Sequence, residues 1–337
     1  MTTVKPQSMQ EDQIVKPINL SQAKEVVFER LPDLKVKSIK YLGGGSSSAF
    51  SINNELIVKF PKLDFDGQQY ADFLQAFRRE VKLNKIVSKI VKPHEIITPL
   101  EQVLGPTQNF AGPIFLYQLF SGTEVEKYRF TSSEKEKLVI LLGDFLKKLH
   151  SVNLNQTLFI GLSKVTLEDI KIGWHKQYVY YKRNVFPLLK SNEVQWFTAL
   201  YEDFLADSAK MKLKVVLTHG DFGPENVLVP KEFNRLQIID FEDMALADPV
   251  LDFCVWYQHF GTSFVNQMLE SYGKVDKYFL MRVKFYSSRL PLIYFDLYRK
   301  SGNKKFLTFA RKFLKKIKTF LNYRFSTISR LFAIQNY

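Results

Sequence analysis

The chain has 337 residues, and its composition, 46% hydrophobic and 24% charged, is typical of a globular protein with a sizeable core. Its single cysteine, Cys254, excludes a disulfide framework and a metal site built on cysteines. The N-terminus lacks the apolar segment of a signal peptide, and no apolar run is long enough to span a membrane, so we expect a cytoplasmic protein.

The net charge of +14 is concentrated near the C-terminus, where residues 297–330 hold eleven basic residues and no acidic one. Phenylalanines recur among them at helical spacing, which predicts an amphipathic helix that packs its aromatic face on the rest of the protein. Weak contact of its lysines with an anionic membrane surface or a nucleic acid is the alternative. We expect a monomer with no stable partner of either kind.

The first elements along the chain are a tail and a helix. The polar residues 1–17 predict a flexible tail. Residues 19–32 predict a helix, with Ser21 as its N-cap and a proline at its end.

The rest of the N-terminal third is predicted to be mostly β. Two β-rich runs, 35–41 and 55–60, are separated by a segment that contains a loop of glycines and serines. A long amphipathic helix over 66–90 follows, and residues 95–104 and 112–122 predict two further strands.

The remainder of the chain is predicted to be mostly helical, beginning with residues 132–210. A short strand then leads into the stretch "LTHGDFGPENVLV", and residues 226–229 and 236–241 predict a small hairpin. This order of elements predicts an α+β protein of two lobes, residues 18–121 and 122–337.

The stretch "LTHGDFGPENVLV" contains two overlapping signatures of protein kinases. Asp221 begins a D-F-G, which carries metal in those enzymes. It also ends an H-G-D that is followed by Asn226 at the spacing of their catalytic loop. One aspartate cannot have both roles. A second carboxylate, Asp240, ends the hairpin.

If the two short strands pair as an antiparallel hairpin, Asn226 and Asp240 meet at one end of it, beside Asp221. Two carboxylates and an amide oxygen favour a hard cation, and Mg²⁺ shares such ligands with substrate phosphates. The alternative is that these side chains only shape turns. In the N-terminal lobe, Lys59 in a strand and Glu80 on the long helix would complete a phosphate site.

The order of a glycine- and serine-rich loop, Lys59, Glu80, "HGDxxxxN" and "IIDF" resembles the aminoglycoside phosphotransferase family, small-molecule kinases with the protein-kinase-like fold. The stretches "FLKKLHSV" and "DMALADPVLDF" extend the resemblance over about residues 20–260. Residues 60–87 are similar to the entry region of aminoglycoside 2″-phosphotransferases. The metal aspartate of the family lies in "IIDF", so the resemblance implies that the D-F-G is a coincidence of letters.

The resemblance implies a role for each motif residue. Asp221 would accept or orient the proton of the attacking hydroxyl, while Asn226 and Asp240 would hold Mg²⁺ on the phosphates. Lys59 would contact the α- and β-phosphates of ATP or GTP, and Glu80 would position it.

The resemblance also implies a nucleotide site in the N-terminal lobe. The small-residue loop, within Gly43 to Ser48, would cover the phosphates with backbone N–H groups, and backbone groups after the last strand of the lobe would contact the purine. The residues so assigned are Gly44, Gly45, Ser46, Ser47, Gln118 and Phe120. We expect His219 to brace the catalytic loop rather than to act as a base.

The acceptor is predicted to be a small molecule, because Gly223 replaces the lysine that serves peptide hydroxyls in protein kinases. An aminoglycoside is a polycation and requires an acidic site. Glu242, Asp243 and Glu270 are candidates for that site, whereas Asp252 is predicted to cap a helix.

Two alternatives stay open. The acceptor could be another hydroxylated compound, such as a macrolide, a choline-like molecule, an amino sugar or an unknown metabolite; the lysine-rich segment favours a neutral or anionic acceptor if it folds over the substrate. Outside the enzymes, the chain could be a non-catalytic module that docks through its basic helix. The presence of every motif residue favours the enzyme.

Overall fold

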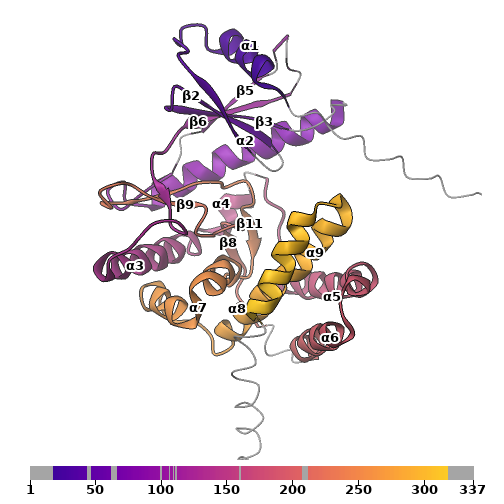
Figure 1. Cartoon of the computed structure of the whole chain (residues 1–337). Coiled ribbons are helices and arrows are strands. Elements are labelled where there is room, and N and C mark those ends of the chain that lie inside the picture. The colour runs from indigo at the N-terminus through magenta and orange to yellow at the C-terminus, as the bar shows by residue number, and fades with distance from the viewer. Residues whose placement is uncertain are drawn as a thin grey trace, which may run out of the picture. The chain divides into compact units, whose positions relative to one another are not determined.

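The computed structural model describes residues 18–43, 47–61, 67–98, 101–105, 107–108, 110, 112–158, 161–206 and 212–317 (Figure 1). The chain divides into two compact units. One lies within Met1–Lys85 and Pro99–Ser121, and the other within Ile86–Thr98 and Gly122–Tyr337.

Three features predicted from the sequence lie outside the described residues. They are the tail 1–17, the loop residues Gly44, Gly45 and Ser46, and the end of the basic segment, 318–330. In the part of the chain that is described, no helix is both long and apolar enough to cross a membrane.

The first unit begins with helix α1 (Leu20–Arg30), whose N-cap is Asn19. The Asn19 side chain accepts a hydrogen bond from the backbone N–H of Gln22, and the Gln22 side chain accepts one from the backbone N–H of Asn19. This capping box satisfies two backbone donors at the start of the helix. The prediction of Ser21 as N-cap is therefore wrong, because Ser21 already lies inside the helix.

A five-stranded antiparallel sheet forms most of the first unit, in the order β1-β2-β3-β6-β5. The strands are β1 (Ile39–Gly43), β2 (Ser47–Ile52), β3 (Leu56–Pro61), β5 (Glu101–Leu104) and β6 (Ile114–Gln118). Strand β2 lies where the sequence predicted only a connecting segment, because its small serines hide the strand pattern. Its residues are nevertheless almost all buried.

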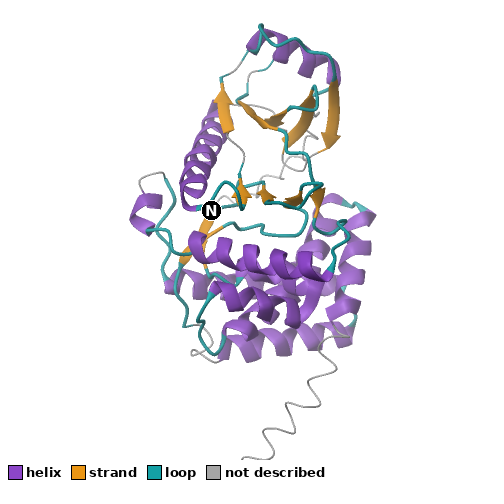
Figure 2. Ribbon diagram, turned by 90° about the vertical axis from the view of Figure 1, so that its left-hand side faces the viewer, coloured by secondary structure: helices purple, strands orange, loops and turns teal. Residues whose placement is uncertain are grey.

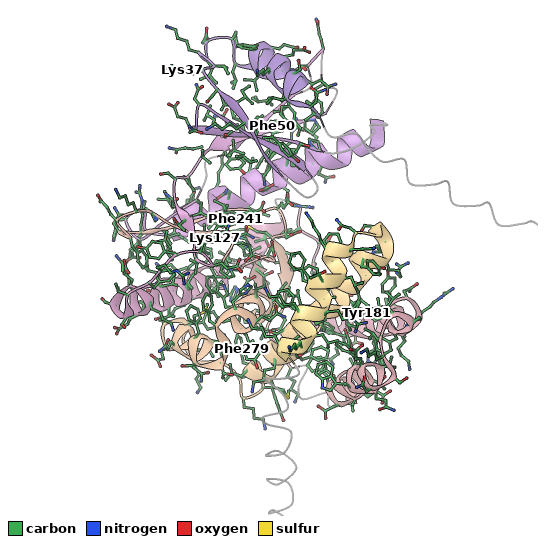
Figure 3. All side chains as sticks on the ribbon, viewed as in Figure 1. Lys37, Phe50, Lys127, Tyr181, Phe241 and Phe279 are labelled. Carbon is green, nitrogen blue, oxygen red and sulfur yellow. The ribbon has the colours of Figure 1, made fainter. Side chains whose placement is uncertain are left out.

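The two faces of this sheet are covered by different helices. Helix α1 buries Ala23, Val26 and Val27 in one cluster with Phe50 of β2 (Figure 3). Their spacing of three and four residues places them on one side of the helix. Helix α2 (Gly67–Ile90) packs against the opposite face, where the rings of Phe77 and Phe115 lie 4.9 Å apart.

The second unit contains two small sheets among its helices (Figure 2). One has the order β4-β10-β9-β7, with β4 parallel to β10, and the other pairs β11 with β8. The strands are β4 (Ile96–Ile97), β7 (Thr123–Glu124), β8 (Val216–Thr218), β9 (Val227–Val229), β10 (Leu236–Ile238) and β11 (Ala245–Ala247). The strand predicted over 95–104 is therefore two strands in two sheets, because β4 pairs with a strand far along the chain.

Helices make up most of the second unit. They are α3 (Ser132–Leu149), α4 (Leu154–Leu158), α5 (Leu167–Asn184), the short 3₁₀ helix η1 (Phe186–Leu188), α6 (Ser191–Ala206), α7 (Leu251–Tyr272), α8 (Phe279–Ser288) and α9 (Leu290–Ser301). Helices α3 and α7 approach closely at Gly143, where a Cβ atom would lie 2.2 Å from the carbonyl oxygen of Met268. Helix α7 is kinked at Gly261, whose φ of 80° favours glycine.

The described part of the basic segment is helical over 304–317 and packs on α9. The ring of Phe313 stacks on Tyr294 with centroids 5.5 Å apart, and Leu314 and Ile317 are buried. The aromatic face therefore packs on the body of the unit, although Phe309 remains 43% exposed.

Candidate active site

The hairpin of β9 and β10 brings the two predicted metal ligands to one end. Val227 pairs with Ile238, and the backbone oxygen of Asn226 accepts a hydrogen bond from the N–H of Ile239 at 3.0 Å. Asp240 follows directly, with a φ of 67°. A non-glycine residue in this left-handed region is uncommon and is concentrated at functional sites.

Asn226 also holds the predicted catalytic aspartate. Its side-chain Nδ2 donates to the backbone oxygen of Asp221 at 2.8 Å and to the carboxylate Oδ2 of Asp221 at 3.0 Å. Asn226 is 7% exposed, whereas Asp221 is half-buried. Because Nδ2 is committed to Asp221, the amide oxygen of Asn226 is left to point elsewhere. The structure thus fixes the Asp221 carboxylate and leaves the amide oxygen of Asn226 beside it to bind a metal.

The loop before Asp221 is anchored by a buried carboxylate. Asp252, which is fully buried, accepts the backbone N–H of His219 at 2.8 Å and that of Gly220 at 3.0 Å. The prediction of Asp252 as a helix cap is wrong, since the N-cap of α7 is Val250 and has no side-chain hydrogen bond. Instead, Asp252 uses its position in the first turn of α7 to reach the loop.

Two histidines complete this anchor. His150, at the end of α3, donates through Nε2 to Asp252 at 3.0 Å, and its Nδ1 lies 2.9 Å from the hydroxyl of Tyr272. His219 donates through Nε2 to the backbone oxygen of Ile239 at 3.1 Å. His219 therefore ties the loop to the residue before Asp240, in agreement with its predicted bracing role.

Gly220 is required by its surroundings. Its φ is 89°, and a Cβ atom there would lie 2.0 Å from the backbone oxygen of Asp243. No side chain fits at that distance. This explains why the loop reads H-G-D where protein kinases have H-R-D.

In the first unit, Lys59 lies on the sheet face that α2 covers. Its Nζ is 5.6 Å from the ring centre of Tyr117 and 6.0 Å from that of Phe115. Phe77 of α2 packs on the same Phe115 ring, and Glu80, one helical turn further on, is 4% exposed. The structure therefore places the glutamate-bearing side of α2 against the lysine-bearing face of the sheet.

Among the positions predicted to contact the nucleotide, Ser47 shares the sheet face of Lys59, whereas Ser48, opposite Phe60, lies on the face that α1 covers. Ser47 and Ser48 follow the small-residue loop, and their buried hydroxyls have no hydrogen-bond partner among the described residues. Gln118 is exposed at the end of β6, and Phe120 is half-buried two residues later.

Two residues near Asp221, Glu225 and Tyr294, were not predicted from the sequence. Partial desolvation raises the pKa of Glu225, and the negative charges of Asp221 and Glu126 raise it further, while His259 lowers it. Burial also raises the pKa of Tyr294 on α9, followed by the charges of Glu225 and Asp221. Glu225 follows the H-G-D within four residues and could have been noticed there. Tyr294 carries no motif.

The acids predicted to bind the substrate are distributed differently. Glu242 and Asp243 are exposed in the turn after Asp240, and the backbone of Asp243 faces Gly220. Glu270 is exposed near the end of α7. Among the described residues, no three histidine, cysteine or acidic side chains converge as metal ligands. A metal held here would rely on Asn226 and Asp240 with ligands from the substrate.

Comparison with solved structures gives the fold. The GDP complex of aminoglycoside 2′-phosphotransferase-IIIa has a TM-score of 0.77 at 21% identity and covers 90% of this chain and 99% of its own. The streptomycin–ATP complex of APH(2″)-IIa has a TM-score of 0.62 at 21% identity, and the match covers 90% of this chain and 99% of that one. Macrolide 2′-phosphotransferase MphH from Brachybacterium faecium has a TM-score of 0.65 at 17% identity, and the match covers 87% of this chain and 98% of that one. These likenesses confirm the predicted α+β, protein-kinase-like fold.

Comparison of the sequence gives the family. No protein of curated function matches it. The model of the phosphotransferase enzyme family matches residues 38–283, which include the hairpin and the H-G-D loop. Since this match spans well over half of the chain, the protein belongs to the phosphotransferase enzyme family and is a phosphotransferase.

Proposed function

We propose that the protein transfers the γ-phosphate of ATP or GTP to a hydroxyl group of an aminoglycoside. The observation that carries this proposal is the grouping of Asp221, Asn226 and Asp240 at one end of a hairpin, with the acidic Glu225 beside Asp221. A carboxylate fixed by an amide is suited to orient a hydroxyl, and acidic neighbours are suited to attract a cation.

Asp221 is proposed to orient the acceptor hydroxyl and to accept its proton as the phosphoryl group transfers. Phosphoryl transfer depends mainly on positioning and on electrostatic stabilisation, so the base need not be strong. The hydrogen bonds from Asn226 hold the Asp221 carboxylate in one orientation. Asp252 holds the preceding backbone through His219 and Gly220.

The same residues fit a divalent cation. The amide oxygen of Asn226 and the carboxylate of Asp240 are hard oxygen ligands, and Mg²⁺ prefers to bind through one or two such groups together with phosphates. When bound, Mg²⁺ offsets the charge of the β- and γ-phosphates. The left-handed backbone at Asp240 is consistent with a residue whose orientation is set by such a role.

In the first unit, Lys59 is proposed to contact the nucleotide phosphates and Glu80 to position it. The hydroxyl of Ser47, on the same sheet face as Lys59, together with the loop residues Gly44 and Gly45, would supply donors for the phosphates. The related structures were solved with GDP, ATP or ADP, which supports a purine nucleotide without deciding between adenine and guanine.

The acceptor is proposed to be cationic. Glu225 and Glu126 add negative charge around Asp221, and an aminoglycoside carries several ammonium groups. The solved relatives include complexes with kanamycin, gentamicin and streptomycin. Such an enzyme would act in the cytoplasm as a monomer and would confer antibiotic resistance.

A macrolide is the second candidate. Two macrolide 2′-phosphotransferases are among the similar structures. The stacked rings of Tyr294 and Phe313 offer an apolar surface near the acidic group. Lys316 lies on the same helix as Phe313; burial lowers its pKa, and the negative charge of Glu126 opposes that shift. This surface suits a large ring with few charges better than a polycation.

A phosphotransfer screen tests the proposal. ATP and GTP are each incubated with Mg²⁺ and a panel of aminoglycosides, macrolides, choline and amino sugars, and transfer to the acceptor is followed by mass spectrometry. We expect an aminoglycoside to gain one phosphate, and Asp221→Asn to slow the transfer by orders of magnitude. Transfer only to another compound would overturn the aminoglycoside assignment. Absence of transfer to every hydroxyl compound, with binding to anionic vesicles, would instead indicate a non-catalytic module.

A further inference from the structure

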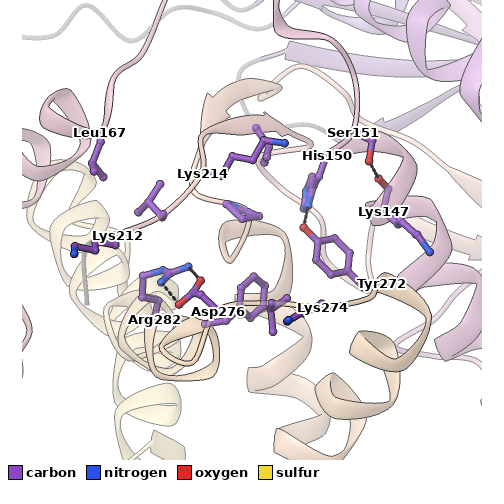
Figure 4. Close-up of a pocket in the computed structure, with 15 residues that line it drawn as sticks. Lys147, His150, Ser151, Leu167, Lys212, Lys214, Tyr272, Lys274, Asp276 and Arg282 are labelled. Atoms are coloured by element: carbon purple, nitrogen blue, oxygen red, sulfur yellow. Dashed lines mark hydrogen bonds and ion pairs between the residues drawn. The ribbon is translucent and has the colours of Figure 1, made fainter. Parts of the chain in front are cut away.

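The second unit contains a cavity of about 660 Å³ away from the catalytic loop (Figure 4). It is lined by the end of α3, the segment before β8, the end of α7 and the start of α8. Lys212 and Lys214 precede β8, whereas Asp221 follows it. The cavity therefore lies at the opposite end of that strand from the catalytic aspartate.

Four lysines line this cavity, and they share one property. None of them forms an ion pair or a hydrogen bond through its ammonium group with a described residue. They are Lys147, Lys212, Lys214 and Lys274. Figure 4 shows Lys214 and Lys274 above and below the cavity, with Lys212 and Lys147 at its two sides. Like charges gathered around one concave surface repel one another, and an anion would offset that repulsion.

The one acidic residue of the lining does not neutralise these lysines. Asp276 accepts two hydrogen bonds from the guanidinium of Arg282, at 3.0 and 2.8 Å. Arg282 is 1% exposed and also donates to the buried Asp248 at 2.9 Å. Arg282 shares its one positive charge between two carboxylates, so these three side chains together offset only one of the four lysines, and the cavity stays positively charged.

The remaining walls are suited to a carbon skeleton. Tyr272 and Phe279 present aromatic surfaces, and Leu167, Val216 and Pro249 present aliphatic ones. The volume lies within the range of about 300–1,000 Å³ that is typical of small-molecule sites. A ligand that satisfies both the lysines and these walls combines an apolar body with a multiply charged anionic group.

We propose that this cavity is a second binding site, for a small organic phosphate. The lysines around the cavity bind its phosphate group, and its carbon skeleton rests on Tyr272 and Phe279. The site is separate from the proposed phosphotransfer centre, and the proposal does not depend on which acceptor that centre uses.

Calorimetry with 1-naphthyl phosphate tests the site. The full chain is first saturated with a non-hydrolysable ATP analogue and Mg²⁺, so that the phosphates of the proposed active site are occupied. We expect one further equivalent of naphthyl phosphate to bind. The double variant Lys214→Glu/Lys274→Glu should weaken this binding by about tenfold or more, because it replaces two attractive charges around the anion with repulsive ones. Absence of any binding to the saturated wild-type protein would overturn the proposal.

A matched control separates the site from bulk charge. Lys304→Glu/Lys305→Glu changes the net charge equally, at two exposed lysines outside the cavity. Its affinity for naphthyl phosphate should stay within about twofold of wild type, since the contacts are local. Equal weakening by both double variants would show attraction to net charge alone and would overturn the proposal. Thermal unfolding of each variant confirms that it is folded.

A lipid headgroup could supply the same phosphate chemistry. Sedimentation with vesicles of phosphatidylglycerol and of phosphatidylcholine distinguishes the two sources. A soluble ligand is indicated if naphthyl phosphate binds and the Lys214→Glu/Lys274→Glu variant sediments with the vesicles to the same extent as wild type. Sedimentation with phosphatidylglycerol that the Lys214→Glu/Lys274→Glu variant loses, without naphthyl phosphate binding, would overturn the soluble-ligand assignment.

Discussion

The Nδ2 atom of Asn226 lies 3.0 Å from the carboxylate of Asp221, and the same atom donates to the Asp221 backbone at 2.8 Å. This double contact closes the turn between the two residues. It also orients the amide so that its oxygen is free of Asp221. One side chain therefore serves both the proposed catalytic carboxylate and the proposed metal site.

Asp221→Asn should lower turnover by about 10²- to 10⁴-fold, the contribution expected of a positioned base. Nucleotide affinity should change by less than about twofold, because the change lies at the acceptor hydroxyl rather than at the phosphates. Steady-state transfer and a nucleotide titration measure the two quantities. Glu232→Gln, at an exposed acid in the hairpin turn, is the control. Full activity in Asp221→Asn would remove that residue from its assigned role.

Asn226→Ala should act on metal dependence as well as on rate. The variant loses both the oxygen ligand and the hydrogen bonds to Asp221, so the Mg²⁺ concentration for half-maximal rate should rise by about tenfold or more. Rates measured over a series of Mg²⁺ concentrations test this. A variant with lower maximal rate but an unchanged Mg²⁺ requirement would indicate that Asn226 only orients Asp221.

Gly220→Ala should destabilise the protein severely. The added Cβ would meet the backbone oxygen of Asp243 at 2.0 Å, and backbone atoms cannot move aside as a flexible side chain can. Gly161→Ala is the matched control, since Gly161 has a similar φ of 93° but nothing within 4 Å of its Cβ position. In urea unfolding, the free energy of unfolding should fall further for Gly220→Ala than for Gly161→Ala, by about 2 kcal/mol or more. Equal losses would show that the backbone angle alone decides.

The hairpin that places Asn226 near Asp240 could be predicted because it is local. Asn226 and Asp240 meet because a short hairpin joins strands close in sequence, and strand pairing fixes which residues meet. Asp252 was misread because its position at the start of a helix resembles a cap, whereas its side chain reaches a loop far away in sequence. No local pattern indicates such a contact.

The fold shows the same division between local and distant information. The capping box at Asn19 and the long helix α2 follow from neighbouring residues, and only the choice of capping residue was wrong. Strand β4 could not be separated from β5 in the sequence, because its partner β10 is chosen by tertiary packing. Tyr294 was missed for the same reason, since only α9 brings it near Asp221.

Glu225→Gln should weaken the binding of a cationic acceptor more than it slows the reaction. Removing one negative charge near Asp221 should raise KM for an aminoglycoside by up to about fivefold, the effect of about 1 kcal/mol, with kcat nearly unchanged. Glu232→Gln removes an equal charge at the exposed hairpin turn and should leave KM unchanged. An uncharged acceptor should not distinguish the two variants. A KM unaffected by Glu225→Gln would argue against a cationic acceptor.

Alkaline pH should destabilise the protein through its buried tyrosines. Burial raises the pKa of Tyr181 to about 12, whereas in the unfolded chain its phenol ionises near 10. Between these values the unfolded state loses the proton that the folded state keeps, so stability falls as pH rises from about 10 to 12. Tyr181→Phe should remove about 2–3 kcal/mol of that loss in urea unfolding. Tyr41→Phe, at a 54% exposed position, should keep the wild-type slope. Identical slopes for Tyr181→Phe and wild type would mean that Tyr181 ionises equally in both states.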